Sequence, residues 1–248
     1  MLANLKEILD FKFSFKTPLA PSNMKKFLIG FLLFVGISVL LLWIYSQYQF
    51  RDRHPGYIVD IDLKSAQTDL LAGFAKVNIT PENFETWTDA NGDSKFNPED
   101  GDTFVDANGN GKFDAIWLAG FQNSRPAQGV LDPLWARAMV LDAGEVKLAL
   151  CVIDMIGFGN DEVIATRKLI AEANPELDYV IIASTHVHSS PDVIGQWGAS
   201  DYSRGVNPAY LNQVQEGIKK AVGEAVRGIR PAVFRFAEEK EKLKPLVG

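Results

Sequence analysis

The sequence has little cysteine, little histidine and no excess of positive charge. A single cysteine, Cys151, excludes a scaffold held together by disulfides. The net charge of -6 argues against binding to nucleic-acid phosphates, which requires clustered lysine and arginine, so we expect no nucleic-acid partner. The chain is 47% hydrophobic, which excludes general disorder. It also lacks the G-x-S-x-G turn of serine hydrolases and any glycine-rich phosphate loop.

One long run without charge stands near the N-terminus, at residues 27–45 (FLIGFLLFVGISVLLLWIY). A helix of this length spans about 28 Å, close to the hydrocarbon thickness of a bilayer. Lysines are concentrated before the run, which predicts a cytoplasmic segment at 1–26. We therefore expect a single-pass membrane protein with a transmembrane anchor at 27–45, a stem at 46–71 and a periplasmic or extracellular domain. A cleaved signal peptide is the alternative, but WIYSQYQF is a poor cleavage site.

Strands and helices alternate through the domain expected at 72–248. This pattern predicts an α/β fold, a layered mixed sheet with helices packed on it, preceded by the transmembrane helix. A hairpin turn is expected at 142–145, and Asn160 is expected to cap a helix. The expected strands are 72–81, 135–141, 146–155, 179–183 and 232–236, and the expected helices are 161–173 and 208–226.

Two histidines, His186 and His188, directly follow the strand at 179–183. Residues two apart on an extended segment point to one side, so both imidazoles can reach one site, and imidazole is a good zinc ligand. Catalytic zinc usually has three protein ligands, and the third histidine of the chain, His54, lies beside the anchor. Asp154 could add an oxygen ligand or serve only as a hydrogen-bonded carboxylate at a strand end. The histidines themselves could also do no more than cap the strand.

A segment rich in Asp, Asn and Gly, residues 82–115, is expected to be a surface insertion with little core. It holds two stretches with oxygen ligands spaced as in EF-hand calcium loops. Neither is complete, because Ser94 replaces the glycine of the first and Trp117 replaces the glutamate of the second. We expect loops stabilised by Ca²⁺; unliganded turns are the alternative. The candidate calcium ligands are Asp89, Asn91, Asp93 and Asn97 in the first loop and Asp106, Asn108, Asn110 and Asp114 in the second.

Five motifs occur in one order: AGFAKVNITP (72–81), GFQ (120–122), LWARAMVL (134–141), VIDMIGF (152–158) and ASTHVHSSPD (183–192). Together they resemble the N-terminal catalytic domain of the neutral/alkaline ceramidases. The resemblance implies a zinc-dependent amidase that cleaves the N-acyl bond of ceramide-like lipids, giving a sphingoid base and a fatty acid. It implies that His186 binds zinc and that His188 is a catalytic residue beside the metal, hydrogen-bonded to water or substrate.

The chain departs from the family pattern at and after the histidines. Val187 replaces the usual threonine, Ser190 replaces a glycine, and no histidine follows His188. The further zinc ligands of the family come later in its sequence, so we expect 72–248 to be the first half of a catalytic domain, or a domain that has lost its metal. Two alternatives stay open: a metal-dependent hydrolase of another amide or ester, and a non-catalytic module stabilised by calcium.

Overall fold

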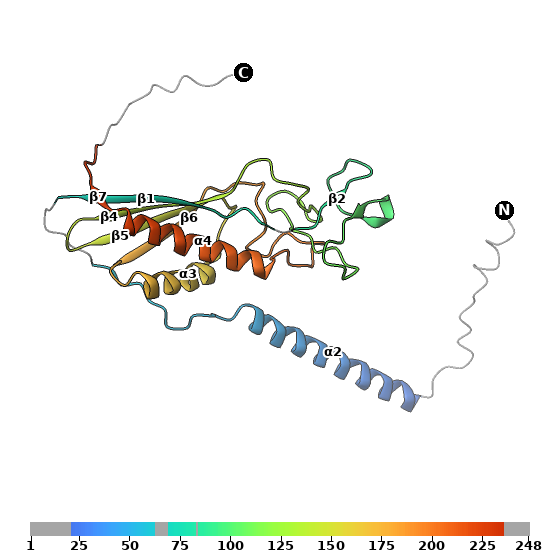
Figure 1. The fold of residues 1–248 in the computed structure, drawn as a ribbon. Helices are drawn as coiled ribbons and strands as arrows, with labels where there is room; N and C mark the ends of the chain where they lie inside the picture. Colours follow the sequence, from blue (N-terminus) through green and yellow to red (C-terminus); the bar gives the residue numbers. More distant parts are fainter. Residues whose placement is uncertain (1–20, 63–68, 83, 236–248) are drawn as a thin grey trace, which may run out of the picture. The chain divides into compact units, whose positions relative to one another are not determined.

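The computed structural model describes residues 21–62, 69–82 and 84–235 and divides the chain into two compact units, Met1–Pro55 and Gly56–Gly248. The first unit holds one long helix, α2 (Pro21–Gln49; Figure 1). Its segment Met24–Gln49 is long and apolar enough to cross a membrane, a property that a signal sequence shares. The large apolar side chains from Phe27 to Tyr45 are all exposed, so none of them is buried in a protein core.

The second unit is built on a five-stranded mixed sheet with the order β6-β5-β4-β1-β7 (Figure 1). Neighbours β1, β4 and β5 are antiparallel, and the predicted turn at 142–145 joins β4 to β5. β5 and β6 are parallel and connected through a helix, as a parallel pair requires. The α/β class is confirmed. The strands are β1 (Leu71–Asn78), β4 (Trp135–Asp142), β5 (Lys147–Ile153), β6 (Tyr179–Ser184) and β7 (Arg230–Pro231).

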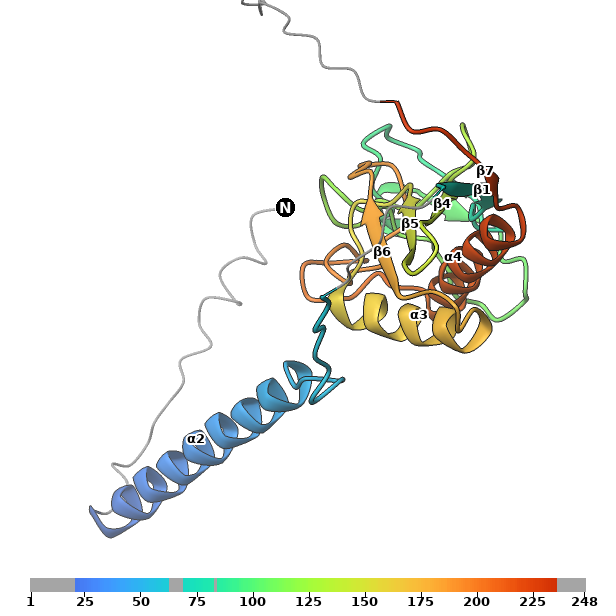
Figure 2. The ribbon, with the colours of Figure 1, turned by 90° about the vertical axis from the view of Figure 1, so that its left-hand side faces the viewer.

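Two helices, α3 (Asn160–Ala173) and α4 (Pro208–Arg227), lie on the same side of the sheet (Figure 2). The Asn207 side chain caps α4 by accepting from the N–H groups of Ala209 and Tyr210. The apolar face of α4 packs on small residues of the sheet. At Gly73 of β1, a Cβ would lie 1.9 Å from the Ala225 oxygen, so only glycine allows this approach. The core joins Val214, Ile218, Ala221 and Val222 of α4 to Ala136, Ala138, Val140, Ala149 and Cys151 of the sheet.

The parallel ladder between β5 and β6 is fixed before β6 begins. The Asp178 N–H donates to the Lys147 oxygen at 2.9 Å, and the Lys147 N–H donates to the Asp178 carboxylate at 2.7 Å. From there Leu148 pairs with Tyr179 and Ile153 pairs with Ser184. The end of β6 is therefore placed beside the end of β5.

Two local predictions are wrong. Asn160 does not cap α3. The capping position is Gly159, which has extended backbone angles and no side chain that could accept a hydrogen bond. The strand expected at 232–236 is instead the two-residue β7 at Arg230–Pro231, which pairs with Ala72 and Leu71 at the start of β1. Phe236 lies outside the described residues.

The segment 82–115 contributes little to the core, as expected: Trp87 and Ala115 are its buried apolar residues in the described chain, and neither belongs to the main cluster. It has local order of its own, since two short strands, β2 (Trp87–Thr88) and β3 (Thr103–Phe104), pair there, with a 3-10 turn η1 (Pro98–Asp100) between them. An aromatic cluster fills the space that they enclose, with ring centroids 4.4 to 6.3 Å apart. Its members are Trp87, Phe96, Phe104, Phe113 and Trp117.

Candidate functional site

The histidine segment continues the β5–β6 ladder for two residues beyond the strands. The Thr185 N–H donates to the Ile153 oxygen at 3.0 Å, and the His186 N–H donates to the Met155 oxygen at 2.9 Å. Ligand sites of α/β sheets lie beyond the carboxyl ends of their strands, and this segment occupies that position.

The two imidazoles face each other. Their Nε2 atoms are 3.3 Å apart, and their ring planes meet at 80° with centroids 4.9 Å apart. The Nδ1 atom of His186 lies 2.6 Å from the Ile156 oxygen. A carbonyl can only accept, so Nδ1 carries the proton and the His186 Nε2 keeps its lone pair. The His188 Nε2–H can donate to it.

His186 and His188 do lie side by side, but not for the reason that we predicted, namely that both stand on an extended segment. His186 has φ of +61°, in the left-handed region, so the segment is not extended there. The turn at His186, rather than the alternation of a strand, brings the rings together. A left-handed non-glycine residue is uncommon and is often found at functional sites.

Three residues that the sequence did not single out as site residues surround His188. A Cβ at Gly120, which has φ of +120°, would lie 2.7 Å from the His188 Cβ. The Phe121 ring meets the His188 ring edge to face at 5.1 Å. Arg125 donates to the His188 oxygen at 2.9 Å. The GFQ motif at 120–122 was a usable signal for the first two, but no sequence pattern pointed to Arg125.

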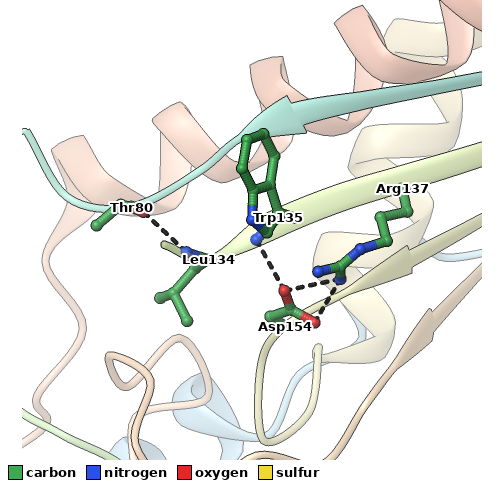
Figure 3. Close-up of polar contacts among 5 residues, drawn as sticks. All are labelled: Thr80, Leu134, Trp135, Arg137 and Asp154. Atoms are coloured by element: carbon green, nitrogen blue, oxygen red, sulfur yellow. Dashed lines mark hydrogen bonds and ion pairs between the residues drawn. The ribbon is translucent and has the colours of Figure 1, made fainter. Parts of the chain in front are cut away.

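Asp154 contacts an arginine, and no hydrogen bond joins it to either histidine in the described part of the chain. Its carboxylate accepts from the Trp135 N–H at 2.9 Å and from Arg137 at 2.7 and 2.8 Å (Figure 3). Nearby, the Leu134 N–H donates to the Thr80 hydroxyl at 2.8 Å. Of the two roles left open by the sequence, Asp154 therefore has that of a hydrogen-bonded carboxylate at a strand end.

The third histidine and the single cysteine have contacts of their own. His54 belongs to the first unit, where its N–H donates to the Asp52 carboxylate. Cys151 is buried in β5, and burial raises the pKa of its thiol to about 12, so the thiol is protonated at neutral pH and packs as a core residue.

The donor atoms of the pair suit zinc, but they are too few. Imidazole nitrogens with a carbonyl bound to the opposite ring nitrogen are usual zinc ligands. Among residues 21–62, 69–82 and 84–235, however, no group of three or more His, Cys, Asp or Glu is arranged to hold a metal. His186 and His188 thus supply at most two of the ligands that a catalytic zinc ion needs.

The two predicted calcium loops repeat one sequence pattern, DANGDSKFN at 89–97 and DANGNGKFD at 106–114, which the sequence prediction did not identify as a repeat. In each, the first aspartate accepts N–H bonds from its own loop: Asp89 from Gly92 and Ser94, and Asp106 from Gly109, Asn110 and Gly111. The bond from Gly111, followed by bonds from other N–H groups of the loop, lowers the pKa of Asp106.

A buried carboxylate closes each loop at equivalent positions. Asp102 accepts from the N–H groups of Ala90 and Asn97 at 2.8 Å in the first loop. Glu85 accepts from the N–H groups of Ala107 and Asp114 at 2.9 and 2.8 Å in the second. Two asparagine side chains, Asn108 and Asn110, donate to the Asp114 carboxylate. The calcium assignment stays a prediction, because no three acidic groups of the described chain converge on one point.

An apolar cavity of about 500 Å³ borders the histidine segment through Val187 and Ser189. Its other walls are mostly apolar and include Phe84, Ile116 and Leu131. A larger hollow, of about 950 Å³, lies between the second loop and the start of α4 and is lined by no histidine.

Comparisons with known proteins give structural matches only. No family model and no curated protein sequence matches the chain. The crystal structure of neutral ceramidase from Pseudomonas aeruginosa matches 66% of this chain with 17% identity and a TM-score of 0.47. A structure described as ceramidase complexed with C2 matches the same share with 18% identity and a TM-score of 0.44. The chain covers 22% of the length of each. The chain is thus remotely similar in structure to neutral ceramidases.

Proposed function

We propose that this chain is a membrane-anchored, zinc-dependent amidohydrolase of the neutral-ceramidase type, acting on the N-acyl amide bond of ceramide-like lipids. One observation carries the proposal: His186 and His188 face each other directly beyond β6, inside the ordered motifs that resemble those enzymes. The products would be a sphingoid base and a fatty acid.

Each histidine has a distinct part in this proposal. The Ile156 carbonyl fixes the His186 ring through Nδ1, so Nε2 is the ligand atom. Without metal this Nε2 is paired with His188; zinc held there would leave the His188 N–H to a water molecule or a substrate carbonyl. Zinc, when bound, would polarise the amide carbonyl and activate water at neutral pH. Because His186 is the one ligand that the proposal assigns and a catalytic zinc ion usually has three protein ligands, two further ligands are required, at least one of them from outside the described residues.

The surroundings of the pair suit a lipid amide. The cavity behind Val187 and Ser189 is mostly apolar, as a site for an alkyl chain should be. Helix α2, as an uncleaved anchor with a cytoplasmic N-terminus, would hold the enzyme at the membrane that contains such lipids.

The experiment compares zinc content and hydrolysis in the purified full chain, in detergent, with two histidine variants. His186→Ala should lose bound zinc, and His54→Ala, in the other unit, should keep it. Equal zinc in wild type and His186→Ala contradicts the assignment of the ligand. Hydrolysis is then measured with a fluorescent ceramide beside short N-acyl amino acids.

A second candidate rests on the shortage of ligands. If the chain binds no zinc and hydrolyses neither substrate, it is better described as a non-catalytic module stabilised by its two loops. Cleavage of the N-acyl amino acids without cleavage of ceramide would favour a hydrolase of another amide.

A further inference from the structure

The two histidine rings are held by different means. The His186 ring is fixed by the 2.6 Å bond between its Nδ1 and the Ile156 oxygen. Within the part of the chain that the structure describes, the His188 ring has no hydrogen bond other than its contact with His186. Something else must therefore keep His188 turned toward its partner.

Arg125 connects the main chain of His188 to the neighbouring loop. One terminal nitrogen of its guanidinium group donates to the Ala119 oxygen at 2.7 Å and to the His188 oxygen at 2.9 Å. The same two segments are joined by the Ala119 N–H, which donates to the Ser190 oxygen at 2.9 Å. A single side chain thus bridges two carbonyls that belong to different segments.

The guanidinium group also reaches the His188 ring indirectly, through Phe121. The Arg125 Cζ lies over the Phe121 ring, 5.1 Å from its centroid, within the range of a cation–π contact. The Phe121 ring in turn meets the His188 ring at 5.1 Å and 61°. Gly120 leaves the space that this arrangement needs, since a Cβ there would lie 2.9 Å from the His188 Nδ1.

Arg125 is partly buried, at a cost. Its Nε atom is buried and finds no hydrogen-bond partner among the described residues, and desolvation lowers the pKa of the guanidinium group, which stays charged at neutral pH. A buried donor without a partner is rare in folded proteins and calls for a reason. The bridge to His188 and the contact with Phe121 provide that reason.

We propose that Arg125 is a positioning residue that holds His188 against His186, by fixing the His188 main chain and by supporting Phe121 against the ring. Its functional meaning rests on the proposed function, but the geometry does not. Lysine cannot replace it fully, because an ammonium group lacks the planar shape that packs on an aromatic ring while bridging two carbonyls.

The test is nuclear magnetic resonance of the metal-free full chain in detergent micelles, with labelled histidine. The sequence contains only three histidines, so variants of His54 and His186 assign the ring signals. Wild type should show a nuclear Overhauser cross-peak between the rings of His186 and His188. Arg125→Ala should lose it, and Arg125→Lys should weaken it.

The matched control is Arg137→Gln, which removes another arginine of the same unit with carboxylate contacts instead of carbonyl contacts. It should leave the cross-peak unchanged. Circular dichroism identifies any variant that fails to fold, and Arg125→Lys or Phe121→Leu then takes the place of Arg125→Ala. A folded Arg125 variant with the wild-type cross-peak overturns the proposal, as does a wild type without one. Zinc content of His186→Ala decides the proposed function separately.

Discussion

Gly120 shows how much the site depends on a single residue. Its φ of +120° is a conformation that L side chains rarely adopt, and its position leaves no room for a Cβ beside His188. Here the identity of one residue determines both the path of a loop and the place of a neighbouring imidazole.

We expect Gly120→Ala to lower the free energy of unfolding by about 1–3 kcal/mol, because the new methyl group is strained and collides with His188. The matched control is Gly129→Ala, since a Cβ at Gly129 meets nothing within 4 Å. It should change stability by less than about 0.5 kcal/mol. Denaturant unfolding of both variants gives the comparison, and equal effects would contradict the crowding seen at Gly120.

The residues of the site were predictable to different degrees. The H-x-H spacing revealed that His186 and His188 belong together, because two imidazoles close in sequence can reach one point. It could not reveal the left-handed turn at His186, which depends on bonds to Met155 and Ile156 from another part of the chain. Arg125 was missed because its role comes from contacts with residues distant in sequence.

At the scale of elements, the strands with clear apolar runs were predicted well, and the errors occur where an element depends on its neighbours. β4 and β5 follow from two apolar runs and the turn between them. β7 lies at Arg230–Pro231, ahead of the strand expected at 232–236, because its position is set by pairing with the start of β1, which is distant in sequence. The start of α3 at Asn160 depends on the backbone geometry of Gly159 before it and not on a side-chain cap.

The two loops at 89–97 and 106–114 are the elements for which we predict a response to calcium. Millimolar Ca²⁺ should raise the melting temperature of the full chain, because an ion that binds only the folded state stabilises it. The low pKa of Asp106 keeps its carboxylate charged and ready to bind a cation.

The matched test for these loops replaces one side chain in each and one outside them. Asp89→Ala and Asp106→Ala should each reduce the shift in melting temperature, and Glu216→Ala, on exposed helix surface, should leave it unchanged. Magnesium provides a second comparison. The absence of any shift with calcium would remove the assignment.

At the scale of the whole molecule, the chain combines an apolar helix with a separate α/β unit. The sequence predicted both parts, because a long uncharged run and an alternating pattern are local signals. It could not show whether the two histidines hold a metal, since that depends on residues that the fold brings together, and the described part of the chain places no third His, Cys, Asp or Glu beside them.

We expect the expressed protein to keep its N-terminal segment and to behave as an integral membrane protein. Intact mass should be 27.4 kDa, the value for the full chain. The protein should also stay in the membrane fraction after extraction with alkaline carbonate, because an apolar span is not released by charge or pH. A lower mass with a new N-terminus after the apolar run would show that α2 is a cleaved signal sequence.

The length of the ladder between β5 and β6 also sets the position of the histidine segment. Hydrogen bonds of Asp178 with Lys147 fix the ladder at one end, and those of Thr185 and His186 fix it at the other. The number of residues between these two ends is therefore fixed by the length of the partner strand. Insertion or deletion of one residue within 179–184 would turn Val180 out of the core or move His186 off the Met155 carbonyl, so this stretch should tolerate exchange of side chains far better than any change of length.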